Sequence, residues 1–597
     1  MDGWVGSILR VNLTRGDYTV EDLDPDLAET FLGGRGLADK LLFDEIDPTV
    51  DPFSPENKLI IATGPLTGTH VPATGRAMVV TKSPLTGAIA SANFGGYFGP
   101  ELKFAGYDMI IFEGKSPEPV YLSIVDDNVE IKPAKHIWGK RTSETDKIIK
   151  AEAEDEWKGR ETHTIRIGPA GENLVRMSAV IYSGGAAARS GVGAVMGSKN
   201  LKAVAVRGTK AITIADKEGY QETVKASWDK VMTSKATERA LTHGTWDLIF
   251  LAKRVSALCS LNCQAGELVE MKDIDGRNVK KEIFVKSKSC FGCGRGCMKV
   301  SRVVHPDFES EGMGPEYEGF DELGPQCGIA NISAIAKAAH LCDELGMDTI
   351  STGVTIACAM ELYEKGFLPE KDVGYKLNFG SDKAMVELVE KTGLRQNFGD
   401  ALAEGGYRLA EKYGHPEVFM GAKKQEMPAW HPQYNQATGL AYATANCGAC
   451  HTRGLLNVFE VRTETEGAPA EVKWGQDYFT AIDSAGGCWS LYMTTSEDFG
   501  DTVAMLSALT GVDFTEESLL QAGERIWNLE RLFNLKAGLT AADDTLSKRI
   551  LEEPCLTGAA EGQVVRLNEM LPEYYELRGW DKNGVPTPEK LAELGLA

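Results

Sequence analysis

The first third of the chain alternates short apolar runs with glycine and proline turns. The runs are rich in β-branched and aliphatic residues and occupy positions 8–13, 58–62, 77–81, 109–112 and 120–124. Runs of this length between turn residues are typical of strands. A segment that begins near Ser143, with acidic residues in its first turn, is expected to be a helix, before strand character returns at 164–168. The pattern predicts a β-rich N-terminal domain over residues 1–210.

After residue 216 the apolar residues recur at helical spacing instead. The helical segments expected from this spacing are 217–260, 333–345, 352–366, 383–392, 400–413 and 515–536. Several of them begin near Asp, Ser or Thr, which favour the first turn of a helix. We therefore expect two mainly helical domains, over residues 211–414 and 415–597, and an α+β protein as a whole.

Composition narrows the class of protein. A chain of 597 residues is long enough for several domains with ample apolar cores. Its net charge of -23 would repel phosphates, which argues against nucleic acid or an anionic membrane as a partner. The start of the chain does not resemble a secretion signal, and no apolar run is long enough for a membrane span. We expect a cytoplasmic protein that acts on small molecules with a protein redox partner.

Three of the twelve cysteines lie within eight residues, at Cys290, Cys293 and Cys297, and glycines separate them. Thiolates at this spacing bind iron or zinc, and an iron–sulfur cluster would need a fourth ligand, which Cys488 could supply. The alternative is a structural zinc site completed by the pair Cys259 and Cys263.

A second motif occurs twice. Asp343, Gly346 and Asp348 share the pattern Asp-x-x-Gly-x-Asp/Cys with Asp483, Gly486 and Cys488. Glycine lets the backbone approach a ligand closely, and an aspartate can accept two N–H donors from a planar heterocycle. Two copies predict a ligand with two pterin-like rings, and Cys488 would join this site to the cluster.

Two glycine-rich segments, 92–99 and 186–199, could offer backbone N–H groups to phosphate, with structural turns as the alternative. The glycine spacing in the second differs from the dinucleotide motif, so we reject a nicotinamide cofactor. Glu318 and His451 lie in turn-rich segments and could transfer protons in a pocket, although such a residue, taken alone, is more often a surface or hydrogen-bonded structural residue. The pair Cys447 and Cys450 is assigned to core packing in preference to metal binding.

Taken together, these motifs resemble the tungsten-dependent aldehyde:ferredoxin oxidoreductases over essentially the whole chain. The segments that carry the resemblance are 64–68, 81–87, 92–99, 191–200 and 524–528. It implies that the β-rich domain forms the base for a tungsten bis-pyranopterin, with tungsten preferred over molybdenum, and that two helical domains cover it. Each Asp-x-x-Gly segment would bind one pterin.

The resemblance also assigns residues. The ligands of one 4Fe-4S cluster would be Cys290, Cys293, Cys297 and Cys488. Contacts to the pterins and their phosphates would come from Arg76, Asn93, Gly95, Ala186, Arg189, Asp343, Met347, Asp348, Arg453, Asp483, Gly487 and Cys488. The backbone carbonyls of Asn93 and Ala186 would hold a magnesium ion that bridges the pterin phosphates. Glu318 and His451 would transfer protons.

The function implied is oxidation of aldehydes to carboxylic acids, with the reverse reduction also open to the enzyme. Electrons would pass singly through the cluster to ferredoxin or to dedicated iron–sulfur or flavin subunits. One alternative is the tungsten subunit of a complex that acts on another low-potential substrate, such as an aromatic thioester. Another is a non-catalytic iron–sulfur electron-transfer subunit.

Four positions depart from the family pattern. Gly185 and Cys447 stand where arginines are expected, and Arg453 replaces a lysine, so phosphate anchoring is expected to differ in detail. Lys337 replaces the glutamate that, with His340, would complete an iron site between subunits. We therefore expect no bridging iron, and an oligomer or complex formed through a different contact.

Overall fold

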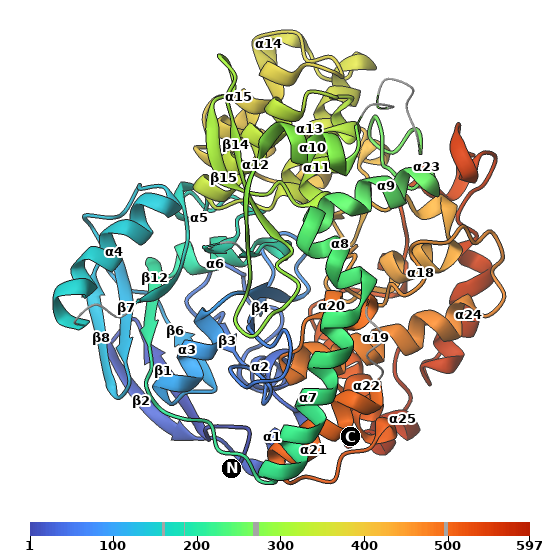
Figure 1. Cartoon of the computed structure of the whole chain (residues 1–597). Helices are drawn as coiled ribbons and strands as arrows, with labels where there is room; N and C mark the ends of the chain where they lie inside the picture. The colour runs from blue at the N-terminus through green and yellow to red at the C-terminus, as the bar shows by residue number, and fades with distance from the viewer. Residues whose placement is uncertain (158–160, 184, 267–270, 272–273, 495–498) are drawn as a thin grey trace.

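The computed structural model describes the chain except for residues 158–160, 184, 267–270, 272–273 and 495–498. The N-terminal third is built around two six-stranded sheets, and the rest is mainly helical. Figure 1 shows the blue and cyan strands at the left, with the green to red helices above and to the right. The α+β class predicted from the apolar pattern is confirmed.

The first sheet has the strand order β2-β1-β6-β3-β4-β5. Its strands are β1 (Ser7–Asn12), β2 (Asp17–Asp22), β3 (Leu59–Ala62), β4 (Arg76–Lys82), β5 (Ile89–Gly95) and β6 (Met109–Glu113). Successive side chains of a strand point to opposite faces. Ile60 accordingly packs among residues of the C-terminal helices, whereas Ile61 packs toward the second sheet. Both faces of this sheet are therefore covered.

The second sheet has the order β11-β10-β9-β12-β7-β8. Its strands are β7 (Val120–Val125), β8 (Asn128–Pro133), β9 (His163–Arg166), β10 (Val180–Tyr182), β11 (Gly185–Ala187) and β12 (Leu201–Arg207). Ile165 and Val204 belong to the same apolar core as Ile61 of the first sheet. The helix expected near Ser143 is α4 (Thr142–Trp157), and its Ile149 packs in a small core with Ala203.

Helices fill the remainder of the chain. Besides α4, the helices of the β-rich part are α1 (Pro25–Phe31), α2 (Gly34–Glu45), α3 (Phe98–Ala105), α5 (Pro169–Glu172) and α6 (Val192–Ser198). The longer helices that follow are α7 (Lys217–Thr233), α8 (Lys235–His243), α9 (Asp247–Arg254), α10 (Gly276–Ile283), α11 (Tyr317–Leu323), α12 (Ile332–Leu345), α13 (Thr349–Glu364), α15 (Asp382–Gly393), α17 (Gly406–Lys412), α18 (Gln436–Thr444), α19 (Ala468–Ala485), α21 (Phe499–Thr510), α22 (Glu516–Lys536) and α24 (Leu567–Leu577). Shorter ones are α14 (Glu370–Val373), α16 (Gly399–Leu402), α20 (Trp489–Thr494), α23 (Lys548–Glu552) and α25 (Pro588–Glu593). Within the described residues, none of these helices has the length and apolar character needed to span a bilayer.

A three-stranded sheet interrupts the region that the sequence pattern assigns to helices. It consists of β13 (Phe284–Lys288), β14 (Met298–Val303) and β15 (Ser310–Met313). Lysines 286 and 288 are exposed on the edge strand β13, and charge of this kind protects a sheet edge while hiding its apolar pattern. The boundary at residue 414 stays a prediction, since one apolar core includes residues on both sides of it.

Each of the two large sheets contacts the C-terminal end of a long helix through a glycine that follows a strand. A Gly-Pro pair begins two residues after the end of β3, at Gly64, and two residues after the end of β9, at Gly168. A Cβ atom on Gly64 would lie 2.3 Å from the carbonyl oxygen of Ala485, and one on Gly168 would lie 2.3 Å from that of Leu345. Each glycine therefore lets the last residue of a long helix, α19 or α12, rest directly on a strand end.

Replacing Gly64 by alanine should lower thermal stability, because the added Cβ meets backbone atoms that cannot rotate away. Overpacking of this kind typically costs about 1–3 kcal/mol. The comparison variant is Gly366→Ala, which has a φ of +76° but nothing within 4 Å of an added Cβ. Differential scanning calorimetry should show the larger decrease in Tm for Gly64→Ala. Equal decreases would mean that α19 does not depend on this close approach.

Candidate active site and cofactor site

Four thiols converge beside the first sheet. Cys290, Cys293 and Cys297 lie in the loop between β13 and β14, and Cys488 follows the end of α19. Each of the three loop thiols interacts electrostatically with Cys488. Burial raises the pKa of the Cys297 thiol to about 12 and also raises those of Cys290 and Cys293. A positively charged metal centre would favour the thiolate forms of this group.

Arg76 connects the thiols to the sheet. Its guanidinium donates hydrogen bonds to the sulfur of Cys488 and to Oδ1 of Asn93, both at 2.8 Å. Burial opposes ionisation of Cys488, but Arg76 outweighs it, so the pKa of this thiol is lowered. Gly95 is needed on the neighbouring strand, since a Cβ there would lie 2.8 Å from the sulfur of Cys290.

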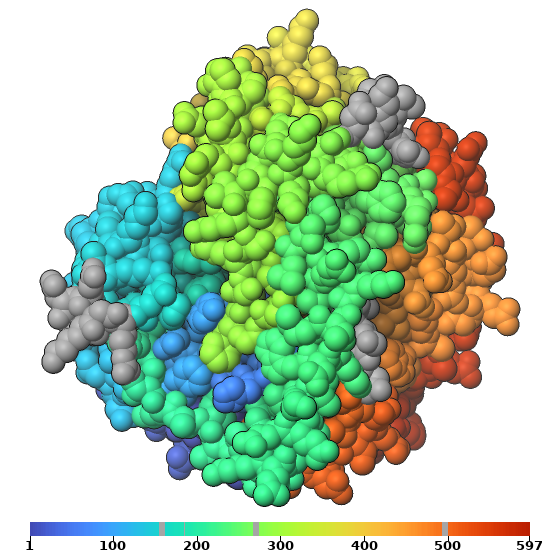
Figure 2. Space-filling model, in the orientation of Figure 1, coloured from blue at the N-terminus to red at the C-terminus, as the bar shows by residue number. Residues whose placement is uncertain are grey.

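The cysteine loop lies under a thin cover of side chains. A Cβ on Gly294 would lie 2.6 Å from the sulfur of Met232 in α7, and one on Gly296 would lie 3.0 Å from Leu241 in α8. Met232 itself is 53% exposed. In Figure 2 the green surface of α7 and α8 runs along the front of the molecule. Over Gly294 and Gly296, a single side chain, that of Met232 or Leu241, separates the cysteine loop from solvent.

The pair proposed for a zinc site lies in different surroundings. Cys259 interacts with Cys263, Asp321 and Glu322, and the backbone N–H of Cys263 donates to Oε1 of Gln326 at 2.8 Å. Across the described residues, no three His, Cys, Asp or Glu side chains are grouped closely enough to bind one metal ion. The zinc alternative therefore gains no support, whereas a cluster of several irons needs its thiols spread apart.

The first Asp-x-x-Gly segment joins α12 to α13. Gly346 ends α12 in the left-handed conformation, with a φ of 78°. Met347 bridges to Ser178, and Asp348 caps α13 by accepting from the backbone N–H of Ile350 and Ser351. Asp343 is half-buried, and its surroundings raise the pKa of its carboxyl to about 7, chiefly by desolvation. Of the two aspartates, Asp348 has an evident structural role.

The second segment ends α19, and its glycine has the same conformation, with a φ of 92° at Gly486. Asp483 is 2% exposed. It accepts a hydrogen bond from Nδ2 of Asn93 at 2.9 Å and pairs with the guanidinium of Arg453 at 2.5 Å. Gly487 follows and leads to Cys488. The backbone repeat is therefore real, but the side chains around the two copies differ.

The two sheets meet at the predicted phosphate and magnesium positions. A Cβ on Gly185 would lie 3.0 Å from the carbonyl oxygen of Gly95, so β11 and β5 approach each other backbone to backbone. β11, which contains Ala186, and β5, which contains Asn93, are therefore neighbours. An arginine at position 185 would disturb the approach, which gives a physical reason for the glycine there.

Arg189 lies at the edge of this junction. Its guanidinium donates to Oδ2 of Asp348 at 3.1 Å and to the carbonyl oxygens of Glu426 and Ala449. Its Nε is buried without a hydrogen-bond partner among the described residues, and the same is true of the Nε of Arg453. Both arginines thus have an N–H group available to an anion.

Glu318 and His451 face each other. Nδ1 of His451 lies 3.9 Å from Oε1 of Glu318, and neither atom has a hydrogen-bond partner within the described part of the chain. The other oxygen of Glu318 accepts from the backbone N–H of Ala429 at 2.9 Å, which fixes the carboxyl. Burial raises the pKa of Glu318, although His451 works in the opposite direction. The pair presents one proton acceptor and one ring nitrogen to the same space.

A buried ionic group that the sequence reasoning missed supports Asp483. Arg35 and Asp39 on α2 pack against Glu530 on α22, and the guanidinium of Arg35 pairs with Glu530 at 2.6 Å and lies 3.8 Å from Asp483. The only sequence signal was the spacing of four residues between Arg35 and Asp39. Their partner is about 490 residues away, so one sequence offers no means of pairing them.

His340, considered for an intersubunit iron site, is 4% exposed. Its Nε2 bonds to the hydroxyl of Ser301 at 2.8 Å and its Nδ1 to that of Ser310 at 3.0 Å. Lys337 donates to the carbonyl oxygen of Glu309. Both ring nitrogens of His340 are therefore engaged within the chain.

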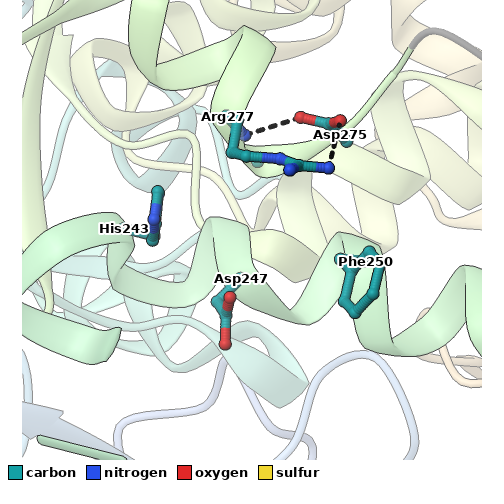
Figure 3. A pocket seen from close by; sticks show the side chains of 6 residues that line it. His243, Asp247, Phe250, Asp275 and Arg277 are labelled. Atoms are coloured by element: carbon teal, nitrogen blue, oxygen red, sulfur yellow. Dashed lines mark hydrogen bonds and ion pairs between the residues drawn. The ribbon is translucent and has the colours of Figure 1, made fainter. Parts of the chain in front are cut away.

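A surface hollow of about 220 Å³ lies between α8, α9 and α10 (Figure 3). Its lining consists of His243, Asp247, Phe250, Asp275, Gly276 and Arg277. Asp275 caps α10 by accepting from the backbone N–H of Arg277 at 2.7 Å. None of the residues predicted for the site lines this hollow.

Comparison with known proteins identifies the family. Residues 8–208 match "Aldehyde ferredoxin oxidoreductase, N-terminal domain", and residues 222–596 match "Aldehyde ferredoxin oxidoreductase, domains 2 & 3". The chain is 47% identical over 616 residues to the tungsten-containing aldehyde ferredoxin oxidoreductase of Pyrococcus furiosus, and the match covers 100% of both chains. The chain therefore belongs to the aldehyde ferredoxin oxidoreductase family, a family of oxidoreductases.

More distant relatives share the whole length. The WOR-like subunit of the aliphatic sulfonate oxidoreductase of Pyrococcus furiosus is 32% identical over 628 residues, covering 100% of this chain and 97% of that one. Among solved structures, the active site complex BamBC of benzoyl coenzyme A reductase in complex with 1,5-dienoyl-CoA superposes with a TM-score of 0.86 at 28% identity. That match covers 100% of this chain and 97% of the other. The same fold thus occurs in proteins named for different substrates.

Replacing Cys488 by alanine should reduce the iron content per chain, because it removes the one thiol that comes from outside the β13–β14 loop. The measurement is elemental analysis of protein purified without oxygen. Cys555→Ala is the control, since this buried thiol lies in another part of the helical region. Iron content in Cys488→Ala equal to that of the wild type would remove Cys488 from the cluster.

Proposed function

We propose that this protein oxidises aldehydes to carboxylic acids at a tungsten bis-pyranopterin and passes the electrons singly through a 4Fe-4S cluster to ferredoxin or a dedicated partner subunit. The observation that carries the proposal is the facing pair Glu318 and His451, each with an atom that has no partner in the described part of the chain and that turns to the same space. Family membership over the full length supports it.

The residues fit the groups that the family implies. Cys290, Cys293, Cys297 and Cys488 form a soft donor set suited to an iron–sulfur cluster. Arg189 and Arg453 each have an N–H group without a partner among the described residues, which could bind the pterins and their phosphates. Asp343 and Asp483 would approach one pterin each, and the carbonyl groups of Asn93 and Ala186 would hold magnesium. Gly95 and Gly185 allow Cys290 to approach β5 and β11 to approach β5 at these positions.

The tungsten cofactor, when bound, supplies the two-electron acceptor for the reaction. The chain supplies the proton chemistry. His451 donates a hydrogen bond to the aldehyde oxygen, which makes the carbonyl carbon more electrophilic. Glu318 accepts a proton from the attacking water at Oε1, while the N–H of Ala429 holds Oε2 in place. The raised pKa of Glu318 makes it a stronger base than an exposed carboxylate.

The alternative substrate class, an aromatic thioester, is favoured only by the likeness to the benzoyl coenzyme A reductase complex. The much higher identity to the tungsten-containing aldehyde oxidoreductase weighs against it. One experiment separates the two. Protein purified without oxygen is analysed for tungsten, molybdenum and iron and then assayed by viologen reduction with a panel of aldehydes. Tungsten-loaded protein that reduces viologen with none of them would refute the proposal.

The variant Glu318→Gln is expected to keep tungsten and iron but to lose about 10²–10⁴-fold in kcat, because an amide cannot accept the proton. The control is Glu101→Gln. Glu101 is also a partly buried carboxyl that accepts from a backbone N–H, that of Gly208. A kcat within twofold of the wild type in Glu318→Gln would exclude this residue from proton transfer.

The rate should also depend on pH in a direction set by Glu318. Only the ionised carboxylate accepts a proton, so kcat falls as the pH decreases through its pKa. Because burial raises that pKa, the decrease of kcat on the acidic side of the pH profile should lie above pH 4.5, which is the ordinary pKa of a glutamate. The measurement is kcat at saturating aldehyde from pH 4.5 upward. A profile that stays flat down to pH 4.5 would contradict the assignment.

A further inference from the structure

We propose that Glu322 is the next proton carrier after Glu318 and passes protons from the reaction toward the surface along a buried polar track. The inference rests on the proposed function. Oxidation of an aldehyde by water (RCHO + H₂O → RCOO⁻ + 3 H⁺ + 2 e⁻) releases three protons inside the protein. The electrons leave to the acceptor, and the protons must reach solvent from a pair whose side chains are only 17% (His451) and 14% (Glu318) exposed.

Glu322 lies on the same helix as Glu318, one turn further on. Residues four apart face the same side of a helix, with Cβ atoms about 5–6 Å apart. In Figure 1 this helix, α11, lies among the yellow-green helices above the sheets. Glu322 has no exposed surface, and both of its carboxyl oxygens lack a hydrogen-bond partner among the described residues. A carboxyl used only for structure would be expected to have its oxygens bonded.

The surroundings of Glu322 favour its neutral form. Burial raises the pKa of its carboxyl well above the ordinary value, and Asp321, Cys263 and Glu318 act in the same direction while Arg189 opposes them. A carboxyl that gains and loses a proton without leaving a lasting buried charge is suited to relay. Asp321 keeps one oxygen bonded, since its Oδ2 accepts from the backbone N–H of Cys259, whereas both oxygens of Glu322 lack a partner among the described residues.

Further unpartnered oxygens mark the direction of the track. Oδ1 of Asp321, the hydroxyl of Ser260 and Oδ1 of Asn262 are all buried without a partner in the described part of the chain. Buried polar atoms of this kind are normally bonded to ordered water. Segment 259–263 therefore places sites for water beside the carboxyls of α11.

The track reaches solvent on α13. Nδ2 of Asn262 donates to Oε2 of Glu361 at 2.6 Å, and Glu361 pairs with Nζ of Lys365 at 2.8 Å. The side chain of Lys365 is 43% exposed. Asn262 and Glu361, which also pairs with Arg549, thus lie between the unpartnered atoms of segment 259–263 and the exposed Lys365, and ordered waters would have to complete the path from Glu318 through Glu322.

The test is Glu322→Gln in the complete, metal-loaded protein. We expect wild-type tungsten and iron content and an unchanged KM, with kcat lower by at least about tenfold. The solvent deuterium isotope effect on kcat should increase, because proton transfer becomes rate-limiting. Glu322→Asp keeps the acid and should recover part of the rate, and Glu101→Gln again serves as the control.

Wild-type kcat and isotope effect in Glu322→Gln would overturn the relay and leave the proposed function intact. Equal losses in Glu322→Gln and Glu322→Asp with an unchanged isotope effect would assign Glu322 a structural role and also overturn it. If Glu322→Gln does not fold, the isotope effect of Glu322→Asp decides, and a wild-type value excludes the relay. Failure of the wild type to oxidise aldehydes would overturn the proposed function as well.

Discussion

The ion pair between Asp483 and Arg453 anchors the site, because a buried carboxylate is tolerated only when it is paired. Removing a carboxylate from water costs several kcal/mol, and Asp483 offsets that cost with Arg453 on one side and Asn93 on the other. Asn93 in turn accepts from Arg76, which donates to Cys488. The end of α19, two strands of the first sheet and the thiol cluster therefore form one hydrogen-bonded unit.

The two Asp-x-x-Gly segments have the same backbone and different electrostatics. Both end a helix at a left-handed glycine that rests on a strand end. Asp483 is held by two partners, whereas Asp343 is half-buried with a pKa raised to about 7. A ligand with two similar rings would therefore meet unequal surroundings, with the thiols on only one side. Such asymmetry suits a centre in which electrons must leave in a single direction.

The sequence predicts a large part of this arrangement and misses the rest for physical reasons. Alternating and helical apolar patterns identify the β-rich part and the helices in the six predicted segments, but they miss helices such as α18, α19, α21 and α24. The sequence motifs offer Cys488 as a possible fourth ligand for the cysteine triplet, and the structure brings it near the three loop thiols. The sequence pattern does not predict strand β13, because its exposed lysines interrupt the apolar alternation expected of a strand. The sequence does not predict the buried ionic group of Arg35, Asp39 and Glu530, because an ion pair between distant segments produces no periodic pattern. The unpartnered state of Glu322 depends on packing and is visible only in three dimensions.

The hydrogen bond between Arg76 and Cys488 joins residues 412 positions apart in the chain. Contacts of such separation form late, since the entropy of closing a long loop must be offset before they stabilise anything. A ribosome-bound chain lacks the thiol and the carboxylate that complete the site until its last fifth has been made. A metal centre that Cys488 and Asp483 help to hold would therefore be completed only after most of the chain has been synthesised.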